Sequence, residues 1–469
     1  MGFVSLFLYI LLSVISPAEI LPSLAPLRLA FWVGIVGLLI SLTSLLWRKH
    51  HCGRFPQFWA VMALLFVMCV SSIINDAYLG AYSKVLSGLG VSLSLFLLVI
   101  LNVDSLKRLK WTAFAIVISA LALCAQGLYS CATGWDSWRV QFVYADRDQG
   151  QEKLEHREGY SDIAGQLRSS GDMKGLRDFT LIYRAAMLSN GSIAMRVRGN
   201  GVLQDPNDLA LGLITAMPFC WLAWTKGRRF RNLFLVWLPT AVMLATMYYT
   251  KSRGGMVALL AILGLMWSRR LGVTKTALML GLISVAMVGL KFTGGRMIAA
   301  DDSSEGRIDA WGEGFHMFQS HPLLGVGYNG FIEHHQITAH NSFVLCFSEG
   351  GLTGYFLWIF ILVSSMMLVR NLMKIPGTGE AADRVRRWAG TLQLSMCGFI
   401  VGGFFLSRTW VYVFYMLAAM ICALAVAAWN EDLEVQLPGM GSMVKRTLLI
   451  QVASMVVIYC VVRLNWLIT

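Results

Sequence analysis

Charged side chains are scarce in this sequence, and their scarcity restricts the class of protein. Only 14% of the 469 residues are charged, whereas 57% are hydrophobic, and the mean hydropathy is +0.62. So few charges cannot cover a soluble globule, and apolar runs long enough to cross about 30 Å of hydrocarbon recur along the chain. The composition excludes a soluble protein and predicts a polytopic membrane protein.

Recognisable cysteine and metal-ligand patterns are also missing. The nine cysteines are an odd number, and no spacing of Cys and His is typical of a metal site. Most of them lie inside apolar runs, the usual place of a small hydrophobic side chain: Cys69, Cys124, Cys220, Cys346, Cys397, Cys422 and Cys460. The sequence therefore predicts neither a disulfide framework nor a metal centre.

The chain has no repeat of fixed period, no low-complexity tract and no linker-like stretch. We therefore expect one membrane domain with elaborations on its outer face. The first apolar run has no basic segment before it and no small-residue cleavage site after it, so it is interpreted as a retained helix.

Thirteen apolar stretches have the character of membrane-spanning helices. They lie near residues 2–20, 28–47, 57–74, 84–102, 110–132, 207–224, 232–250, 253–268, 275–293, 342–369, 387–407, 410–429 and 447–467. We expect an all-α, polytopic integral membrane protein with about 12–13 transmembrane helices, of which the last is the weakest prediction.

Basic residues fall in alternate connections between these stretches. They are Arg48, Lys49 and Arg54; Lys107, Arg108 and Lys110; Lys226, Arg228, Arg229 and Arg231; Arg269, Arg270 and Lys275; and Arg370, Lys374, Arg384, Arg386 and Arg387. Since Lys and Arg favour cytoplasmic loops, these connections and the N-terminus are predicted to be cytoplasmic. Orientation and attraction to anionic membrane lipids thus explain the net charge of +13 without a nucleic-acid partner.

The same alternation predicts two long connections outside the membrane. We expect transmembrane helices over 1–132, 207–293 and 342–469, an outer loop over 133–206, and a second outer loop with the polar motifs over 294–341. Both loops are expected to carry short amphipathic helices.

The second outer loop contains one such predicted helix. Asp302 and Glu305 have capping-box spacing, and His321-Pro322 ends the pattern. Apolar side chains recur between them at roughly a 3.6-residue period: Ile308, Trp311, Phe315 and Phe318. Arg307 falls in the first turn, where a cation opposes the helix dipole, by roughly a few tenths of a kcal/mol, unless an anion is near. The position of Arg307 indicates an anionic partner.

Three outer-face segments carry the polar motifs. They are the segment from Arg196-Val-Arg198 to Asp205-Pro206-Asn207-Asp208, the segment Ser252-Arg253-Gly254-Gly255, and the segment from Gly306-Arg307 through Trp311 and Gly325 to His340-Asn341-Ser342 and Glu349. Their order and spacing resemble the O-antigen ligase and Wzy-type polymerase superfamily of bacterial envelope enzymes, over roughly residues 195–360.

The resemblance implies an inverting glycosyltransferase of the bacterial inner membrane. It would move a glycan from undecaprenyl diphosphate to an acceptor hydroxyl on the periplasmic face, without a metal or a cofactor. The acceptor is lipid A core for a ligase, a second lipid-linked glycan for a polymerase, and a protein in a third branch. The sequence leaves these alternatives open.

The resemblance also transfers three catalytic residues to this chain. Arg253 and Arg307 match arginines thought to hold the diphosphate, and His340 matches the histidine of a His-Asn motif. Fixed guanidinium groups can stabilise the charge that a diphosphate leaving group gains, by on the order of several kcal/mol. A histidine just before a helix start is expected to be neutral, and so able to accept a proton from the acceptor hydroxyl.

Six further residues are candidates for binding the diphosphate or the glycan: Arg196, Arg198, Asp205, Asn207, Asn341 and Glu349. Asp205 also has a structural interpretation, because Asp before Pro206 is a standard helix start. A carboxylate two turns into a span, as at Glu349, is costly and therefore usually paired or functional. Glu349 could orient His340 or neutralise an arginine.

Several other patterns are weaker. Gly325-Val-Gly327-Tyr-Asn-Gly330 has nucleotide-loop spacing but no strand before it, so a turn is predicted. Asp146-Arg147-Asp148 resembles a metal-binding pattern that arises easily by chance. A metal-dependent lipid-linked glycosyltransferase would also require carboxylates in the first outer loop, where only Glu19 is present.

A lipid-linked glycan transporter or flippase is the alternative from another class. Against it, the polar motifs gather on one face, and no pair of broken spans carries midplane charges in corresponding halves.

Overall fold

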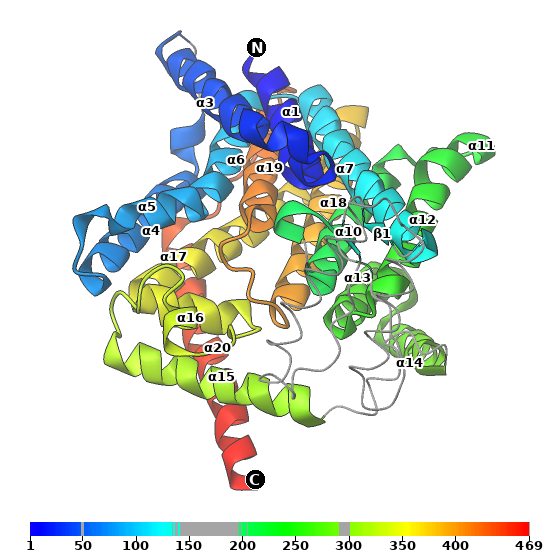
Figure 1. The fold of residues 1–469 in the computed structure, drawn as a ribbon. Coiled ribbons are helices and arrows are strands. Elements are labelled where there is room, and N and C mark those ends of the chain that lie inside the picture. Colours follow the sequence, from blue (N-terminus) through cyan, green and yellow to red (C-terminus); the bar gives the residue numbers. More distant parts are fainter. Residues whose placement is uncertain are drawn as a thin grey trace.

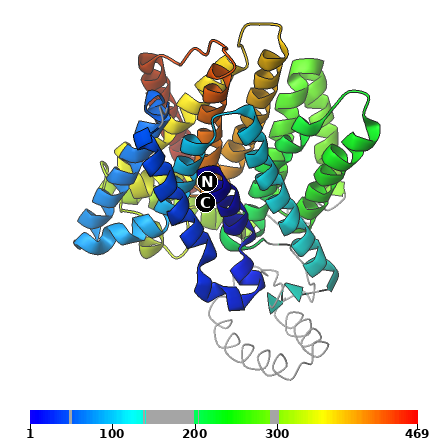
Figure 2. The same cartoon turned by 90° about the horizontal axis from the view of Figure 1, so that it is seen from above.

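A computed structural model describes residues 1–47, 51–133, 135–136, 139–140, 197, 199–203, 205–289 and 301–468. These residues are almost entirely helical, and Figures 1 and 2 show long helices packed side by side. Within these ranges the strands are limited to β1 (Trp135–Asp136) and β2 (Arg139–Val140). The predicted all-α membrane architecture is confirmed.

The first half of the chain contains α1 (Gly2–Ile15), α2 (Pro17–Ile20), η1 (Pro22–Leu27), α3 (Leu29–Trp47), η2 (Cys52–Arg54), α4 (Pro56–Asn75), η3 (Leu79–Ala81), α5 (Tyr82–Ser87), α6 (Leu89–Asn102), α7 (Leu106–Thr133), η4 (Gly201–Leu203), α10 (Pro206–Cys220) and η5 (Trp221–Ala223). The second half contains α11 (Arg229–Asn232), η6 (Leu233–Trp237), α12 (Leu238–Thr250), α13 (Arg253–Leu271), α14 (Val273–Gly289), α15 (Asp301–Ser320), α16 (Phe331–His334), α17 (Ser342–Leu372), α18 (Glu380–Gly403), α19 (Tyr412–Trp429) and α20 (Met440–Ile468).

Each predicted span coincides with one or more of these helices. In the described ranges, 8 helices are long and apolar enough to cross a membrane, or up to 9 if the bent pair α5 and α6 is one span. This number is lower than the predicted 12–13. The difference has physical causes, because α10 has only 15 residues and α18 begins with a charged turn that contains Glu380 and Asp383.

Helix α19 lies at the centre of the molecule (Figure 1). Buried residues make up 94% of its apolar window, the largest share of any candidate span in the described chain. Six alanines between Ala418 and Ala428 leave little side-chain bulk, and small residues let neighbouring helix backbones approach closely. The helix packs against α6, α17 and α18.

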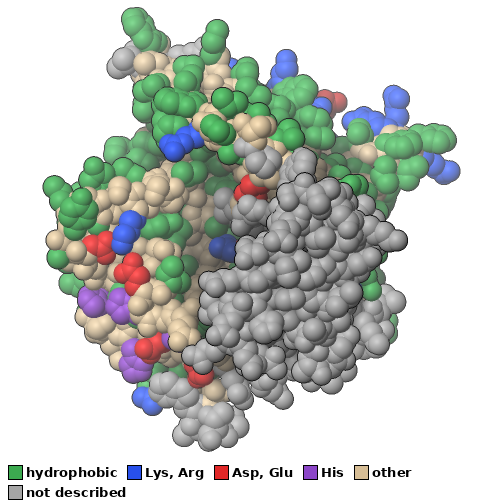
Figure 3. Space-filling view, in the orientation of Figure 1, with side chains coloured by type: hydrophobic (Ala, Val, Ile, Leu, Met, Phe, Trp, Pro, Cys, Tyr) green, Lys and Arg blue, Asp and Glu red, His purple; other side chains and the backbone are tan. Residues whose placement is uncertain are grey.

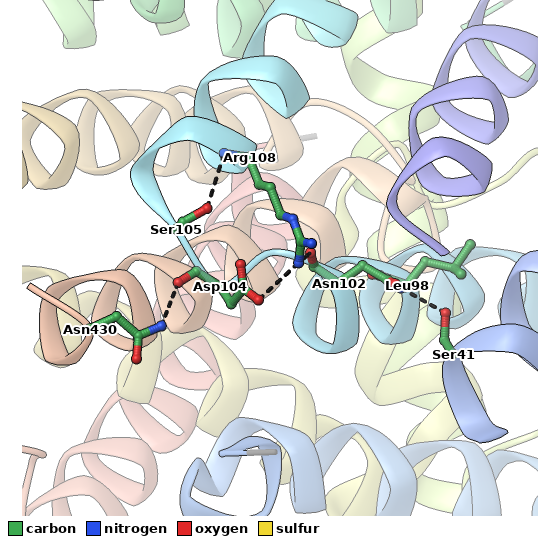
Figure 4. A network of polar contacts seen from close by, with 7 residues as sticks. All are labelled: Ser41, Leu98, Asn102, Asp104, Ser105, Arg108 and Asn430. Atoms are coloured by element: carbon green, nitrogen blue, oxygen red, sulfur yellow. Dashed lines mark hydrogen bonds and ion pairs between the residues drawn. The ribbon is translucent and has the colours of Figure 1, made fainter. Parts of the chain in front are cut away.

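A polar network fixes the end of the molecule at which α7 begins (Figure 4). Asn102 Nδ2 donates to Ser41 Oγ at 2.7 Å, and Arg108 Nη1 donates to the Asn102 carbonyl at 3.0 Å and to Asp104 Oδ2 at 2.8 Å. Asn430 Nδ2 donates to the Asp104 carbonyl at 2.8 Å. The network therefore joins α3, α6, α7 and the end of α19.

Helix α17 is interrupted at Gly351, whose φ of 60° and ψ of −161° are not helical. The segment 322–327 fills the interruption. The Val326 and Gly327 amides donate to the carbonyls of Ser348 and Glu349 at 2.9 and 3.1 Å, while the Leu352 amide donates to the Pro322 carbonyl at 2.8 Å. The glycine-rich pattern is thus a turn, as predicted, and it satisfies the backbone groups that the break exposes.

Candidate functional site

Three helices begin close together at the end of the molecule opposite the Asn102 network. Each start is capped by its own side chain: Asp205 Oδ1 accepts from the Asn207 amide at 2.7 Å, Ser252 Oγ from the Gly255 amide at 3.1 Å, and Asn341 Oδ1 from the Phe343 and Val344 amides at 2.8 and 3.2 Å. Such starts carry partial positive charge. We refer to this end as the site end.

The predicted capping role of Asp205 is therefore confirmed. Asp205 accepts a bond from the Asn207 backbone, and Pro206 occupies the first helical position of α10. The half-buried Asn207 lies in the same turn. A role of Asp205 or Asn207 in binding substrate stays a prediction.

The segment Phe404–Val411, here called the 404–411 loop, joins these starts. Ser342 Oγ donates to the Leu406 carbonyl at 2.6 Å and accepts from the Arg408 amide at 2.9 Å, and Thr409 Oγ1 donates to the Ser342 carbonyl at 2.6 Å. Phe405 packs so closely on Gly254 that a Cβ there would lie 2.8 Å from its Cβ. The loop therefore contacts the starts of both α17 and α13.

The side chain of Arg408 connects the 404–411 loop to the third helix start, that of α10. Its Nε and Nη2 atoms donate to the two carboxylate oxygens of Asp208 in the first turn of α10. The Asp208 side chain is 1% exposed and that of Arg408 is 33% exposed. Burial lowers the pKa of Arg408, but the hydrogen bonds and charge of Asp208 outweigh it and hold the pKa above its ordinary value. The guanidinium therefore stays charged.

Sequence reasoning did not select Arg408. A signal was present, because Arg408 follows the predicted span 387–407 on the predicted outer face, where the positive-inside rule disfavours basic residues. Its pairing with Asp208 joins residues 200 positions apart, which no local pattern encodes.

Helix α15 confirms the predicted amphipathic helix and contacts the same loop. It spans Asp301–Ser320 and crosses α20 in the lower part of Figure 1. Its Trp311 ring packs edge-on against Phe404, with centroids 5.6 Å apart, and Trp311 Nε1 donates to the Ala339 carbonyl at 2.9 Å. Phe315 packs on Phe347 of α17 at 4.9 Å. The apolar stripe therefore fastens α15 beside the segment that contains His340.

The three predicted catalytic residues lie on elements that meet around the 404–411 loop. Arg253 is the first residue of α13, Arg307 lies near the start of α15, and His340 comes two residues before α17. All three are half-buried. Their catalytic roles stay predictions, and the structure brings the elements that carry them together.

His340 has an unusual backbone conformation. Its φ of +49° lies in the left-handed region, which residues other than glycine seldom adopt. Ala339 before it is held by Trp311, and Asn341 after it caps α17. Strained backbones of this kind cluster at functional sites.

Two predicted residues, Arg196 and Arg198, lie outside the described residues. Val197 between them is described, and its amide donates to the Tyr249 carbonyl at 3.0 Å. Asn200 Nδ2 donates to the Ile15 carbonyl at 3.2 Å, and both carboxylate oxygens of Glu19 accept from the Gly201 amide at 3.1 Å. The segment that precedes α10 is thus anchored to the ends of α1 and α12.

Glu349 is 2% exposed and lies at the break in α17. Its Oε2 accepts from Trp410 Nε1 at 2.6 Å and its Oε1 from the Phe331 amide at 3.3 Å. Within the described ranges its bonds go to these groups and not to His340 or an arginine. Glu349 links the interrupted helix to the 404–411 loop and to α16.

Asn341 is fully buried, and only one end of its side-chain amide makes hydrogen bonds. Its Oδ1 caps α17, whereas its Nδ2 has no hydrogen-bond partner among the described residues. An unpaired buried donor costs free energy, about 1–3 kcal/mol, so it is seldom retained without a reason.

A polar patch lies beside the site end, over α4, α5 and α16 (Figure 3). Lys84 Nζ lies 2.8 Å from Asp76 Oδ2 and 3.4 Å from Glu333 Oε1, and His334 is exposed next to Glu333. In the described part of the chain no three His, Cys, Asp or Glu side chains could together hold a metal ion. Asp146-Arg147-Asp148 lies outside the described residues.

Comparison with known proteins adds one finding. Residues 238–359, from α12 through the first half of α17, match the family model described as O-Antigen ligase. No curated protein matches the chain. The match covers Arg253, Arg307 and His340, and it confirms the resemblance inferred from the three motifs. Residues 238–359 are therefore similar to the O-antigen ligase family, in agreement with the predicted resemblance to the O-antigen ligase and Wzy-type polymerase superfamily.

Proposed function

We propose that the protein is an inverting, metal-independent glycosyltransferase that moves a glycan from undecaprenyl diphosphate to an acceptor hydroxyl at the site end. One observation carries the proposal: the helices and the segment that bear Arg253, Arg307 and His340 meet at the 404–411 loop. The three residues lie within the segment 238–359 that matches the family model, and the loop lies outside it. The predicted orientation makes the site end periplasmic in the inner membrane of a bacterium, on the route to lipopolysaccharide or exopolysaccharide.

The charge of the proposed leaving group explains the need for arginines at the site. As the bond between the anomeric carbon and the phosphate oxygen breaks, the diphosphate gains negative charge. Arg253 and Arg307 hold that charge with directional guanidinium donors, and the helix starts of α13 and α17 add partial positive charge nearby. Such fixed groups need no reorganisation during the reaction, so they stabilise the transition state more than the ground state.

The proton of the acceptor hydroxyl explains the need for a histidine at the site. The acceptor oxygen attacks the anomeric carbon from the face opposite the diphosphate, its proton passes to His340, and undecaprenyl diphosphate leaves. One glycosidic bond forms as one sugar–phosphate bond breaks, and the anomeric configuration inverts. His340 acts as general base, a role that contributes about 10²–10⁴-fold to a rate. Arg196, Arg198, Asp205, Asn207 and Asn341 are proposed to hold the diphosphate or glycan, and Glu349 to fix the α17 break.

Lipid A core and a second lipid-linked glycan are equally proposed as acceptors, and a protein hydroxyl is a third choice. The experiment that separates them uses purified protein and an undecaprenyl-diphosphate-linked oligosaccharide in the presence of EDTA. Lipid A core and excess donor are offered in separate reactions. Transfer to lipid A core indicates a ligase, and growth on the carrier indicates a polymerase.

The site assignment is tested in the same assay. Arg253→Ala, Arg307→Ala and His340→Ala should each abolish most transfer. Arg370→Ala is the matched control, because Arg370 is exposed at the other end of α17. If the three site variants fold and keep the wild-type rate, the proposed roles are incorrect. Loss of transfer with EDTA would instead favour a metal-dependent enzyme.

A further inference from the structure

The guanidinium of Arg408 has hydrogen-bond donors that its partner Asp208 does not use. Its guanidinium bonds to Asp208 through one edge, Nε and Nη2, and no bond from its Nη1 is found within the described ranges. The side chain is still 33% exposed, although its partner is 1% exposed. A guanidinium has five N–H donors in a rigid fork, so the second edge keeps donors that face away from Asp208.

The surroundings of Arg408 hold its backbone in place. The Arg408 amide donates to Ser342 Oγ at 2.9 Å, two residues beyond His340. On either side, Ser407 Oγ accepts from Thr338 Oγ1 at 2.6 Å, and Thr409 Oγ1 donates to the Ser342 carbonyl at 2.6 Å. A side chain on such a fixed loop is oriented before any ligand arrives, which lowers the entropic cost of binding.

The pairing with Asp208 determines what Arg408 can bind. A buried carboxylate reduces the net charge, so Arg408 does not act as an isolated point charge. Asp208 instead fixes the plane of the Arg408 guanidinium. The remaining edge of the guanidinium is suited to an oxyanion that accepts two hydrogen bonds. Removing Arg408 alone would leave Asp208 buried and uncompensated, which is strongly destabilising.

We propose that Arg408 is a third arginine of the substrate site, which binds a phosphate oxygen of the lipid-linked donor while Asp208 orients it. This residue lies outside the segment matched by the family, which ends at residue 359. The identity of the anion rests on the proposed function. Arg253 and Arg307 are already proposed to bind phosphate oxygens of the donor. The additional guanidinium of Arg408 makes the site selective for a diphosphate over a monophosphate.

The test compares the binding of undecaprenyl diphosphate and undecaprenyl monophosphate to detergent-purified protein. The main variant is Asp208→Asn/Arg408→Gln, which removes both charges and leaves no buried carboxylate unpaired. It should lose about 10-fold or more in diphosphate affinity, the scale of a charged hydrogen bond, and much less in monophosphate affinity. Asp208→Asn alone keeps the arginine and should lose less.

Arg386→Gln is the matched control. Like Arg408, Arg386 donates to an aspartate, with Nη2 2.6 Å from Asp383 Oδ1, and it also donates to the carbonyls of Ile375 and Gly377. It lies 17 residues before the end of α18, about 25 Å from the site end. A double variant that binds the diphosphate like the wild type would overturn the proposal. So would equal losses for both lipids, or a loss in Asp208→Asn as large as in the double variant, since a purely structural pair predicts these results.

The proposed function and the role of Arg408 can fail independently of each other. If the wild type binds undecaprenyl diphosphate with this selectivity but transfers no glycan, the proposed function fails and the role of Arg408 stands. If the wild type transfers glycan and the double variant keeps the selectivity, the role of Arg408 fails and the proposed function stands.

Discussion

Single residues at the site end cap helices, and their neighbours are the residues proposed to carry the chemistry. Ser252, Asp205 and Asn341 each cap a helix. By doing so they fix the positions of the residues next to them, Arg253 and His340 among these. The proposed chemistry therefore depends on side chains whose first role is to start a helix, and suitable substitutions can separate the two roles.

At His340, backbone conformation and side-chain chemistry can be tested apart. His340→Gly should keep or slightly raise thermal stability, because glycine adopts a φ of +49° without strain. His340→Ala should be slightly less stable than His340→Gly. Both should lose about 10²-fold or more in kcat, since neither offers a base. Thermal unfolding and transfer assays measure these effects, and a glycine variant with wild-type kcat would contradict the assignment.

At Asn341, the cap and the unpaired donor can also be separated. Asn341→Asp keeps the oxygen that accepts from Phe343 and Val344 but removes Nδ2. It should retain stability, whereas Asn341→Ala should lose about 1 kcal/mol of unfolding free energy. If Nδ2 binds substrate, both variants lose transfer. Wild-type activity in a stable Asn341→Asp protein would show that Nδ2 takes no part.

At the scale of elements, breaks and bends shape the molecule. Helix α17 opens at Gly351 to receive the 322–327 turn, and α5 and α6 meet at a 56° bend. Tyr328, directly after that turn, contacts Gly88 at the bend. The turn therefore packs against two interrupted helices at once.

The turn requires two glycines. A Cβ at Gly351 would lie 2.5 Å from the Leu323 carbonyl carbon, and a Cβ at Gly325 would collide with the backbone of Glu349. Both residues also have positive φ, at 60° and 70°. Gly351→Ala and Gly325→Ala should each lower the unfolding temperature strongly and reduce transfer.

Gly390→Ala in α18 provides the control for these two variants, because nothing lies within 4 Å of a Cβ there. It should be neutral or slightly stabilising, by up to about 1 kcal/mol, since alanine favours a helix more than glycine. Equal unfolding temperatures for all three variants would refute the role given to the turn.

The elements also show how far sequence reasoning reaches. Apolar runs predict every span, and the stripe through Ile308, Trp311 and Phe315 predicts α15, because both signals are local. The break at Gly351 and the 404–411 loop are not predictable in this way. They depend on contacts such as Arg408 with Asp208 and Trp410 with Glu349, which join residues 200 and 61 positions apart.

At the scale of the whole molecule, the Asn102 network and the site end lie about one hydrocarbon thickness apart along α7. The basic residue Arg108 lies in the network of Figure 4, where α7 begins. Gln126, five turns further along α7, bonds to Asn200 at 2.9 Å near the site end. Those 18 residues of helix span about 27 Å, close to the thickness of a hydrocarbon core.

Cysteine labelling tests the predicted orientation. Gln319→Cys, exposed at the end of α15, should react with an impermeant maleimide in intact spheroplasts. Glu380→Cys, exposed at the start of α18, should react only after lysis. The exposed Cys460 is replaced by serine in both proteins. The reverse pattern would place the site end in the cytoplasm and would contradict the proposed periplasmic reaction.

The molecule as a whole is proposed to cleave its lipid-linked substrate, whereas a flippase would carry it intact. The most direct measurement reconstitutes the protein in liposomes with a donor labelled in both sugar and lipid, with an acceptor present and His340→Ala as the control. We expect release of undecaprenyl diphosphate and recovery of the sugar on the acceptor with inverted anomeric configuration, from the wild type and not from the variant. Movement of the intact donor across the bilayer, with no sugar released and no difference between the two proteins, would contradict the account.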